Sequence, residues 1–392
     1  MPAVPSRVVL VAHPSPDLYG SDRVLLGSVS GLMAAGWRVV VTVPGPGPLV
    51  PELDRLGAEV RICPTPVLRK AALRPRGLVT LAREAVTGTV AGVGLLRSVR
   101  PAVVYVNTLT IPWWFVLARL TGRPAVGHVH EAEDWPPLLR WALITPLRLA
   151  RTVIANSRYT RRVLAAQDPR VAARAVVVAN PVPAPHDVGP PPARVEGRLG
   201  YVGRLAPRKG VDVAIRALAL LRAGGREATL DLVGAVFPGY EWYEAELRGL
   251  VADLGLTPAV TFHGFRPDVA AMLPGFDAVL VPSRLPESFG NVAVEAALAA
   301  RPVVVTDVGG LTEAVAGLAA VAVVAPEDPR ALADGVERLV ADWPATRQAA
   351  MAGLDLVRER HDPDRYGDRV AAVVAAAAGT VAGTVAGTVA GS

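Results

Sequence analysis

The segment Pro282–Ala296 carries the densest set of residues that could do chemistry. It reads PSRLPESFGNVAVEA, follows the apolar run Ala278–Val281 and leads into an alanine-rich stretch. A helix that begins beyond the carboxyl end of a parallel strand presents unpaired backbone N–H groups and a positive dipole end to anions. Carboxylates accept two hydrogen bonds at once from sugar or ribose hydroxyls. Glu287 and Glu295 could therefore bracket one ligand with a phosphate and hydroxyls, although Glu295 alone would be typical of a solvated helix.

Two further turns contain glycine and follow predicted strands. The segment Gly200–Gly210 reads GYVGRLAPRKG, in which Arg204 and Lys209 would stabilise a diphosphate that departs with negative charge. The segment Val308–Glu313 reads VGGLTE and follows another apolar run. Each turn alone is also typical of an ordinary surface turn. Because ligands collect at the carboxyl edge of a parallel sheet, we expect all three turns to share one rim.

A pair of histidines, His128 and His130, stands at alternate positions of a predicted strand and should face one side of it. No cysteine or third histidine is placed to complete a metal site. We therefore predict structural or substrate contacts for this pair, and neither a metal nor a bound cofactor for the protein.

The composition is that of a globular protein of two domains. Of 392 residues, 51% are hydrophobic and 19% charged, which is unlike a disordered chain and sufficient for two α/β cores. The single cysteine, Cys63, can form neither an intramolecular disulfide nor a thiolate zinc cluster. The first residues pass directly into an apolar run without the features of a secretory signal, which predicts a cytoplasmic location.

Short valine-rich runs alternate with helical stretches along the chain. The runs are unbroken, as is typical of parallel strands that helices cover on both faces. They span Arg7–Val11, Arg38–Val43, Ala102–Val106, Ala125–Val129 and Thr152–Ala155, then Leu199–Val202, Leu230–Val233, Val260–His263, Ala278–Val281, Val303–Thr306 and Val321–Val324. The sequence thus predicts an α/β protein with two doubly wound parallel sheets.

The predicted domain boundary is rich in proline. Residues 180–197 contain six prolines among eighteen positions and no apolar periodicity, which is typical of a stiff linker. We accordingly expect a first domain over residues 1–180, a linker over 181–197 and a second domain over 198–363. A helix over 364–378 could cover either domain, and residues 379–392 form a low-complexity tail.

The positive charge is confined to the first half. Residues 1–190 hold 22 Lys and Arg against 11 Asp and Glu, or +11, so the remainder carries −5 of the total of +6. Such an excess indicates an anionic partner, although solvated arginines would look the same. Basic residues also precede the apolar stretch Gly77–Leu96 in a domain that contains several tryptophans, which predicts peripheral contact with an anionic membrane surface, such as the inner face of the plasma membrane, and no nucleic acid. These residues are Arg69, Lys70, Arg74, Arg76, Trp113, Trp114, Trp135 and Trp141.

Together these segments resemble the retaining glycosyltransferases of family 4, the group 1 glycosyltransferases. The resemblance covers nearly the whole chain except the tail. In the second half it rests on Val202-Gly203-Arg204-Leu205 with Lys209-Gly210, on Pro282-Ser283, on Glu287 and Glu295, and on Pro302-Val303-Val304 before Gly309-Gly310 and Glu313. In the first half it rests on His130-Glu131, Ala155-Asn156-Ser157 and Asn180-Pro181.

The resemblance implies a GT-B architecture with two facing Rossmann-like domains, the first for the acceptor and the second for a nucleotide diphosphate sugar. It also implies roles: Arg204 and Lys209 hold the diphosphate, Glu295 the ribose and Glu287 the hydroxyls of the transferred sugar. His130 would lie near the reacting centre, and together with Glu287, Arg204 and Lys209 it forms the expected catalytic set. The backbone would contact phosphate and sugar at Gly203, Ser288, Phe289, Gly290, Asn291 and Val292. The family commonly has a glycine pair in its first loop, whereas here Gly20 stands alone as the candidate.

The implied mechanism is front-face attack, in which the leaving phosphate helps to deprotonate the incoming hydroxyl and no metal is required. Two alternatives stay open: a nucleotide-sugar 2-epimerase of the same architecture, and a catalytically silent subunit that binds nucleotide. The acceptor could be linked to a lipid or be a small molecule.

Overall fold

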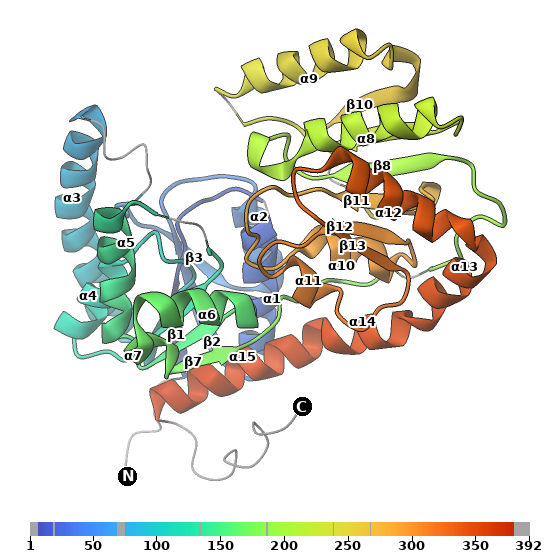
Figure 1. The fold of residues 1–392 in the computed structure, drawn as a ribbon. Helices are drawn as coiled ribbons and strands as arrows, with labels where there is room; N and C mark the ends of the chain where they lie inside the picture. Colours follow the sequence, from blue (N-terminus) through green and yellow to red (C-terminus); the bar gives the residue numbers. More distant parts are fainter. Residues whose placement is uncertain are drawn as a thin grey trace. The chain divides into compact units, whose positions relative to one another are not determined.

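The computed structural model describes residues 7–18, 20–68, 75–132, 135–185, 187–237, 239–266 and 268–379. It divides the chain into two compact units (Figure 1). The first unit comprises Met1–Pro181 together with Pro363–Ser392, and the second comprises Val182–Asp362.

The first unit is built on a parallel sheet with the strand order β3-β2-β1-β4-β5-β6-β7. The five predicted strands form its centre. The sequence analysis missed the two edge strands, β3 and β7, because edge strands are partly exposed and so lack an unbroken apolar run. The strands are β1 (Val8–Ala12), β2 (Arg38–Val43), β3 (Glu59–Ile62), β4 (Val103–Val106), β5 (Ala125–Val129), β6 (Thr152–Ala155) and β7 (Ala175–Val177).

Helices cover both faces of this sheet. Along β1, Val9 and Val11 pack into one apolar core and Leu10 and Ala12 into the other, as expected for a strand buried on both sides. The first core is closed by α1 (Gly20–Ala34), α2 (Leu49–Leu56) and α15 (Pro363–Ala378), and the second by α3 (Pro75–Val99), α4 (Trp113–Leu120) and α5 (Pro137–Ile144). Two further helices follow: α6 (Arg158–Gln167) contacts β6 and β7, and α7 (Pro169–Ala172) packs against α6.

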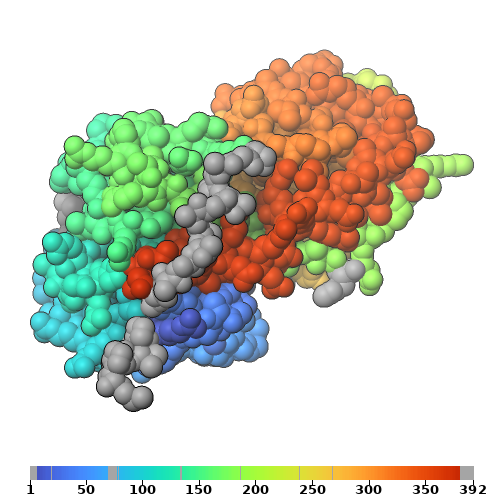
Figure 2. Space-filling view, turned by 90° about the horizontal axis from the view of Figure 1, so that it is seen from below, coloured from blue at the N-terminus to red at the C-terminus, as the bar shows by residue number. Residues whose placement is uncertain are grey.

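The C-terminal helix α15, which the sequence analysis leaves with either domain, packs on the first unit. Its contacts are with α1, β4 and β5, and Figure 2 shows it in red beside the blue N-terminal segment. The two helices approach at a pair of glycines: a Cβ atom on Gly31 would lie only 2.2 Å from the Cα atom of Gly367. Any larger side chain at this crossing would separate α15 from α1.

The second unit is a parallel sheet with the strand order β10-β9-β8-β11-β12-β13. All of its strands were predicted, to within one residue. They are β8 (Arg198–Val202), β9 (Thr229–Val233), β10 (Val260–Gly264), β11 (Ala278–Val281), β12 (Val303–Thr306) and β13 (Val321–Val324). One face packs against α8 (Val211–Ala223), α9 (Glu241–Asp253) and α12 (Pro329–Ala341), and the other against α10 (Asn291–Leu298) and α11 (Leu311–Ala314); α13 (Trp343–Ala352) and α14 (Leu354–Arg360) follow in the chain.

The proline-rich segment predicted as a linker belongs instead to the second unit. Arg301 donates to the carbonyl oxygen of Gly189 at 2.7 Å, Arg347 to Pro191 at 2.8 Å and Trp343 to Pro192 at 2.9 Å. Proline has no N–H group, so such a segment cannot join a sheet, but its carbonyl groups still accept hydrogen bonds. Composition alone does not reveal this anchoring.

Candidate functional site

The candidate site lies where the strand order of the second sheet reverses. There β8 and β11 are hydrogen-bonded neighbours, with Leu199 opposite Ala278, and the chain leaves them toward opposite faces of the sheet. Ligands of open α/β sheets bind in the crevice outside the carboxyl ends of such strands. The segments that follow β8 and β11 are the two motifs with the strongest chemical signal in the sequence.

The centre of this site is a half-buried cluster around the carboxylate of Glu287. Its Oε1 atom accepts from Lys209 Nζ at 2.6 Å and from Ser283 Oγ at 2.7 Å, and Arg208 Nη1 lies 3.6 Å away. None of these three contacts involves Oε2. The predicted partners Lys209 and Glu287, 78 residues apart in sequence, are therefore in direct contact.

Neighbouring charges shift the pKa values of Glu287 and Lys209 in this cluster. Burial by itself would raise the pKa of Glu287, but the cations Lys209 and Arg208 beside it hold that pKa below its usual range. Burial lowers the pKa of Lys209, and the attraction of Glu287 opposes that change. Arg204 is near enough to act on Lys209, so this part of the site holds three cations and one carboxylate. The excess positive charge suits an anionic ligand.

The three predicted turns, which follow β8, β11 and β12, pack closely against one another through their backbones. A Cβ atom on Gly210, where φ is 67°, would lie 2.0 Å from the carbonyl oxygen of Pro282. One on Gly309 would lie 2.4 Å from the carbonyl oxygen of Glu287, and Gly310 N donates to that oxygen at 2.7 Å. Packing between the turns therefore requires glycine at these positions. The three turns lie together at the carboxyl edge of the second sheet, as predicted.

At the start of α10, backbone groups rather than side chains are available to contact a ligand. Gly290 precedes the helix with φ of 126°, and Asn291 and Val292 form its first turn. The ring of Phe289 is buried and meets the ring of His361 edge-on at 5.4 Å, so this residue can offer only its backbone to a ligand. Ser288 is partly buried before the turn, and Glu295 is partly buried in the second turn of α10.

Arg204 follows Gly203, whose φ is 142°, at the end of β8. Its guanidinium carbon lies 3.3 Å from the centroid of the Phe237 ring, and its carbonyl oxygen accepts from the Tyr201 hydroxyl at 2.7 Å. This cation–π contact holds the guanidinium at the end of β8.

A second polar cluster lies at the switch point of the first sheet, between β1 and β4. His130 Nε2 lies 3.1 Å from Asn107 Oδ1, Asn107 Nδ2 lies 3.1 Å from His13 Nδ1, and His13 Nε2 lies 2.8 Å from Asp22 Oδ1. An ionised carboxylate only accepts, so His13 carries its hydrogen on Nε2 and accepts from Asn107 on Nδ1. Asn107 Oδ1 then accepts from the Nε2–H group of His130.

His130 is neutral in this setting. Burial and the nearby His13 lower its pKa to about 3, against a smaller opposite effect of Asp22. Its neighbour Glu131 accepts hydrogen bonds from Thr108 and from the backbone N–H groups of Leu109 and His130, while burial raises the pKa of its carboxyl. Gly20 begins α1 near this cluster in sequence and is exposed.

Sequence reasoning missed several members of these clusters. In the second unit it missed Arg208 and the role of Ser283, although both stand within motifs that it selected. In the first unit it missed His13, Asp22 and Asn107. His13 and Asn107 directly follow the strands β1 and β4, so a search for polar residues at the carboxyl ends of both strands would have found two of the three.

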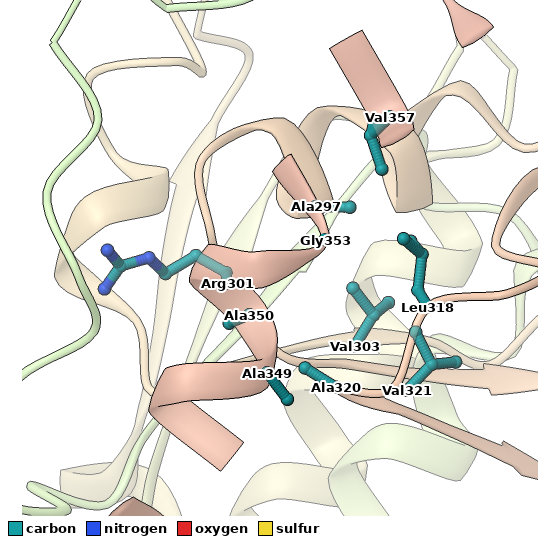
Figure 3. Close-up of a pocket in the computed structure, with 10 residues that line it drawn as sticks. All are labelled: Ala297, Arg301, Val303, Leu318, Ala320, Val321, Ala349, Ala350, Gly353 and Val357. Atoms are coloured by element: carbon teal, nitrogen blue, oxygen red, sulfur yellow. The ribbon is translucent and has the colours of Figure 1, made fainter. Parts of the chain in front are cut away.

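The described residues contain no group of three or more His, Cys, Asp and Glu side chains placed to hold a metal ion. One cavity has a volume of about 10 Å³, the lower limit for one water molecule. Figure 3 shows the residues that line it. Its lining is apolar apart from Arg301, whose guanidinium points away: Ala297, Arg301, Val303, Leu318, Ala320, Val321, Ala349, Ala350, Gly353 and Val357.

One described helix is long and apolar enough to cross a membrane by length and composition. The stretch Val79–Val99 within α3 has a mean hydropathy of 1.2, and only 17% of it is buried. The basic residues Arg69, Lys70 and Arg74 lie outside the described residues, as does the side chain of Arg76. Among the predicted interfacial tryptophans, Trp114 is buried in the core and Trp141 is 66% exposed.

Comparison with known proteins gives concordant results. Residues 19–186 match the family model described as Glycosyltransferase Family 4, and residues 196–342 match Glycosyl transferases group 1. A 2-deoxystreptamine glucosyltransferase of Streptomyces kanamyceticus is 31% identical over 335 residues, which are 77% of this chain and 84% of that protein. A D-inositol 3-phosphate glycosyltransferase of Stackebrandtia nassauensis is 38% identical over 163 residues, which are 40% of this chain and 37% of that protein.

Solved structures agree at the level of the fold. Anabaena Alr3699/HepE, crystallised with UDP and glucose, superposes with a TM-score of 0.78 at 23% identity, over 94% of this chain and 99% of that one. A sucrose-phosphate synthase from Thermosynechococcus elongatus gives a TM-score of 0.72 at 20% identity, over 93% and 98% of the two chains.

Proposed function

The chain belongs to glycosyltransferase family 4, and from this membership we propose that it moves a sugar from a nucleotide diphosphate donor to an acceptor hydroxyl with retention of the anomeric configuration. It is a glycosyltransferase with two Rossmann-like units, the GT-B fold. The observation that carries the proposal is the contact of Lys209 and Ser283 with one oxygen of Glu287 at the switch point of the second sheet.

Residues of this cluster and of α10 are assigned to different parts of the donor. Arg204, Arg208 and Lys209 supply the positive charge for the diphosphate, and the N–H groups at the start of α10 supply further donors. Glu287 uses Oε1 for Lys209 and Ser283, so Oε2 is the atom we assign to a hydroxyl of the transferred sugar. Glu295, in the second turn of α10, is assigned to the ribose.

The proposed transfer needs charge stabilisation more than a protein nucleophile. The bond between the anomeric carbon and the diphosphate oxygen breaks, and a bond from the acceptor oxygen forms on the same face of the sugar. The proton of the acceptor hydroxyl passes to the departing phosphate oxygen. Lys209 and the two arginines stabilise the charge that develops on the diphosphate.

The proposed acceptor is a small polyol that binds at the polar cluster of the first unit. Two observations support this choice: the cluster ends in the neutral histidine His130, which is suited to hydrogen bonds with hydroxyls, and the relatives above are named for 2-deoxystreptamine and for inositol 3-phosphate. Both are ring polyols. The donor proposal is supported by Alr3699/HepE, a structural neighbour solved with UDP and glucose.

A panel of UDP-, GDP-, ADP- and TDP-sugars tests the proposal, first by thermal shift and then by transfer to inositol phosphates and aminocyclitols. A donor at a hundred times its dissociation constant should stabilise the protein by about 2.7 kcal/mol. NMR of the product should show the donor's anomeric configuration. An inverted product would refute retention, and an epimer formed without any acceptor would identify a 2-epimerase instead. Binding with neither product would identify a silent subunit.

A second candidate, a cytoplasmic enzyme with a lipid-linked acceptor at an anionic membrane, is favoured by the exposed apolar side of α3. Val79, Val86 and Val90 are each about two-thirds exposed or more. Co-sedimentation with anionic and neutral vesicles tests this candidate by comparing the parent with Val86→Ser/Val90→Ser. The matched control is Val323→Ser, an exposed valine of the second unit. Binding that ignores lipid charge, or that survives the α3 substitutions, would exclude the candidate.

A further inference from the structure

A chain of polar side chains crosses the aliphatic core of the first unit from its C-terminal helix to its site histidine. Tyr366 of α15 lies 2.6 Å from Ser28 of α1, measured between the hydroxyl oxygens. Ser28 Oγ lies 3.4 Å from the hydroxyl of Tyr105 on β4, which lies 2.5 Å from His128 Nδ1 on β5. Ser28, Tyr105 and His128 are fully buried and Tyr366 is 3% exposed.

Burial holds His128 in its neutral form, in which one ring nitrogen carries a hydrogen. Its contact with Tyr105 is made at Nδ1, where either the tyrosine hydroxyl or an Nδ1–H group can be the donor. The Ser28 hydroxyl lies 3.3 Å from the Val24 carbonyl oxygen and also contacts both tyrosines. Each of these four side chains therefore has a polar partner on another element.

The chain ends against His130. The rings of His128 and His130 lie 3.9 Å apart between centroids, with 43° between their planes. On the other side of His130, Asn107 Oδ1 holds Nε2, as described above. His128 Nε2 and His130 Nδ1 are buried, and neither has a hydrogen-bond partner among the described residues.

We propose that Tyr366 and Ser28 are positioning residues of the acceptor site: through Tyr105 and His128 they fix the ring of His130, so that its Nε2–H group stays directed at Asn107 Oδ1. The proposal rests on the proposed function only where it calls this cluster the acceptor site. It makes the C-terminal helix, distant in sequence, a part of the site.

Packing alone does not explain this chain. The surrounding core consists mainly of Val, Leu and Ala, and burying hydroxyl and imidazole groups costs free energy that Phe and Ala would not incur. The contacts from Tyr366 to His128 instead restrict the orientation of each ring. A neutral histidine whose two nitrogens differ in role needs that restriction, because either tautomer is accessible to a free ring.

Histidine-selective ¹⁵N labelling tests the proposal directly, because the nitrogen shifts of each of the six histidines report its tautomer. We expect the Nε2–H form for His130 in the parent protein. In Tyr105→Phe and Tyr366→Phe the signals of both His128 and His130 should shift or broaden. The matched control is Thr65→Val, which removes a buried hydroxyl that contacts Trp114 in the same unit but outside the chain.

Several outcomes would overturn the proposal. An Nδ1–H tautomer for His130 in the parent would do so without any variant, even if the substitutions prevent folding. So would unchanged histidine signals in both tyrosine variants, or the same shifts in Thr65→Val. These spectra involve no donor or acceptor, so they can fail while transfer is confirmed, and the reverse.

Steady-state kinetics of the variants test whether the chain affects sugar transfer. Loss of one hydrogen bond in the chain should lower kcat of Tyr366→Phe about fivefold with the donor KM unchanged. Ser28→Ala should give a similar loss, and the double variant should be no slower than either single variant, because both act through one chain. Additive losses, or a change confined to the donor KM, would contradict a positioning role.

Discussion

At the scale of single residues, the proposed donor site depends on a charge balance that one substitution can disturb. Lys209→Ala removes the closest cation from the half-buried carboxylate of Glu287 and one charge from the proposed diphosphate site. Charge-assisted hydrogen bonds contribute about 1.5–3 kcal/mol, so we expect nucleotide diphosphate affinity to fall about tenfold to a hundredfold. Arg204→Ala should have a smaller effect of the same sign.

Isothermal titration with the preferred nucleotide checks this prediction. Arg248→Ala is the matched control, because Arg248 pairs with Glu244 on the exposed surface of α9 in the same unit. If Lys209→Ala binds the nucleotide as tightly as that control does, the diphosphate assignment is wrong.

His130 gives a prediction about pH. Its pKa falls from an ordinary value near 6.5 to about 3 on folding, so the unfolded chain binds a proton in that interval and the folded protein does not. The unfolding free energy must therefore decrease as the pH falls from about 6.5 toward 3, by up to ~1.4 kcal/mol per pH unit for one proton. Because burial also lowers the pKa of His128, that residue acts in the same direction.

Urea unfolding of the parent and of His130→Asn between pH 4 and pH 8 measures this slope. The variant should show a flatter dependence below pH 6.5, while the two curves run parallel above pH 7. The same neutrality predicts that kcat shows no titration of His130 near pH 6.5. An equal slope in both proteins would place the pKa of His130 at an ordinary value.

At the scale of elements, the glycines at the contacts between the turns predict that a change in turn packing also changes nucleotide binding. A Cβ atom on Gly310 would lie 2.5 Å from the carbonyl oxygen of Ser288, and the φ of Gly310, −84°, is one that alanine adopts without strain. Gly310→Ala should therefore act through the clash alone. We expect it to displace the segment at Glu287, to destabilise the protein by about 1–3 kcal/mol and to weaken nucleotide binding.

Gly249→Ala is the control for this prediction, since a Cβ atom at that position of α9 meets nothing within 4 Å. A helix-interior alanine should stabilise the protein by about 0.5–1 kcal/mol and leave binding unchanged. Thermal unfolding with and without nucleotide measures both effects. Parent-like stability and affinity in Gly310→Ala would show that the turns are not locked.

At the scale of the whole molecule, the first unit is completed by the end of the chain. Tyr366, Val370 and Val374 of α15 belong to the same apolar core as Val24 and Leu25 of α1. A chain that ends at Asp362 would expose this core, so we expect it to aggregate or to lose the cooperative unfolding of the first unit. Soluble yield and calorimetry measure the loss.

The control is a chain that ends at Gly379, which keeps every residue of α15 and should unfold like the parent. Gly367→Val makes the same test without truncation, because the two helices touch at Gly31 and Gly367. A chain ending at Asp362 that unfolds as the parent does would show that α15 is dispensable to the first unit.

The sequence by itself determined the two parallel sheets and most residues of the proposed donor site. Strands covered on both faces leave unbroken apolar runs, and polar residues that follow such runs must gather at one edge, which is why Lys209, Glu287 and Gly309 could be placed together. The edge strands β3 and β7 are not unbroken apolar runs, so the sequence did not predict them. The proline-rich segment lacks apolar periodicity, so its attachment to the second unit could not be predicted either.

The tertiary structure alone decided which unit α15 covers and which side chains meet around His130. Tyr366 and Ser28 are 338 residues apart, and His13 and Asn107 are 94 apart. An apolar pattern reports how strongly one element is buried, but it does not report which distant element buries it. Hydrogen bonds between buried side chains depend on that second fact, because each donor must lie within about 3 Å of an acceptor that another element supplies.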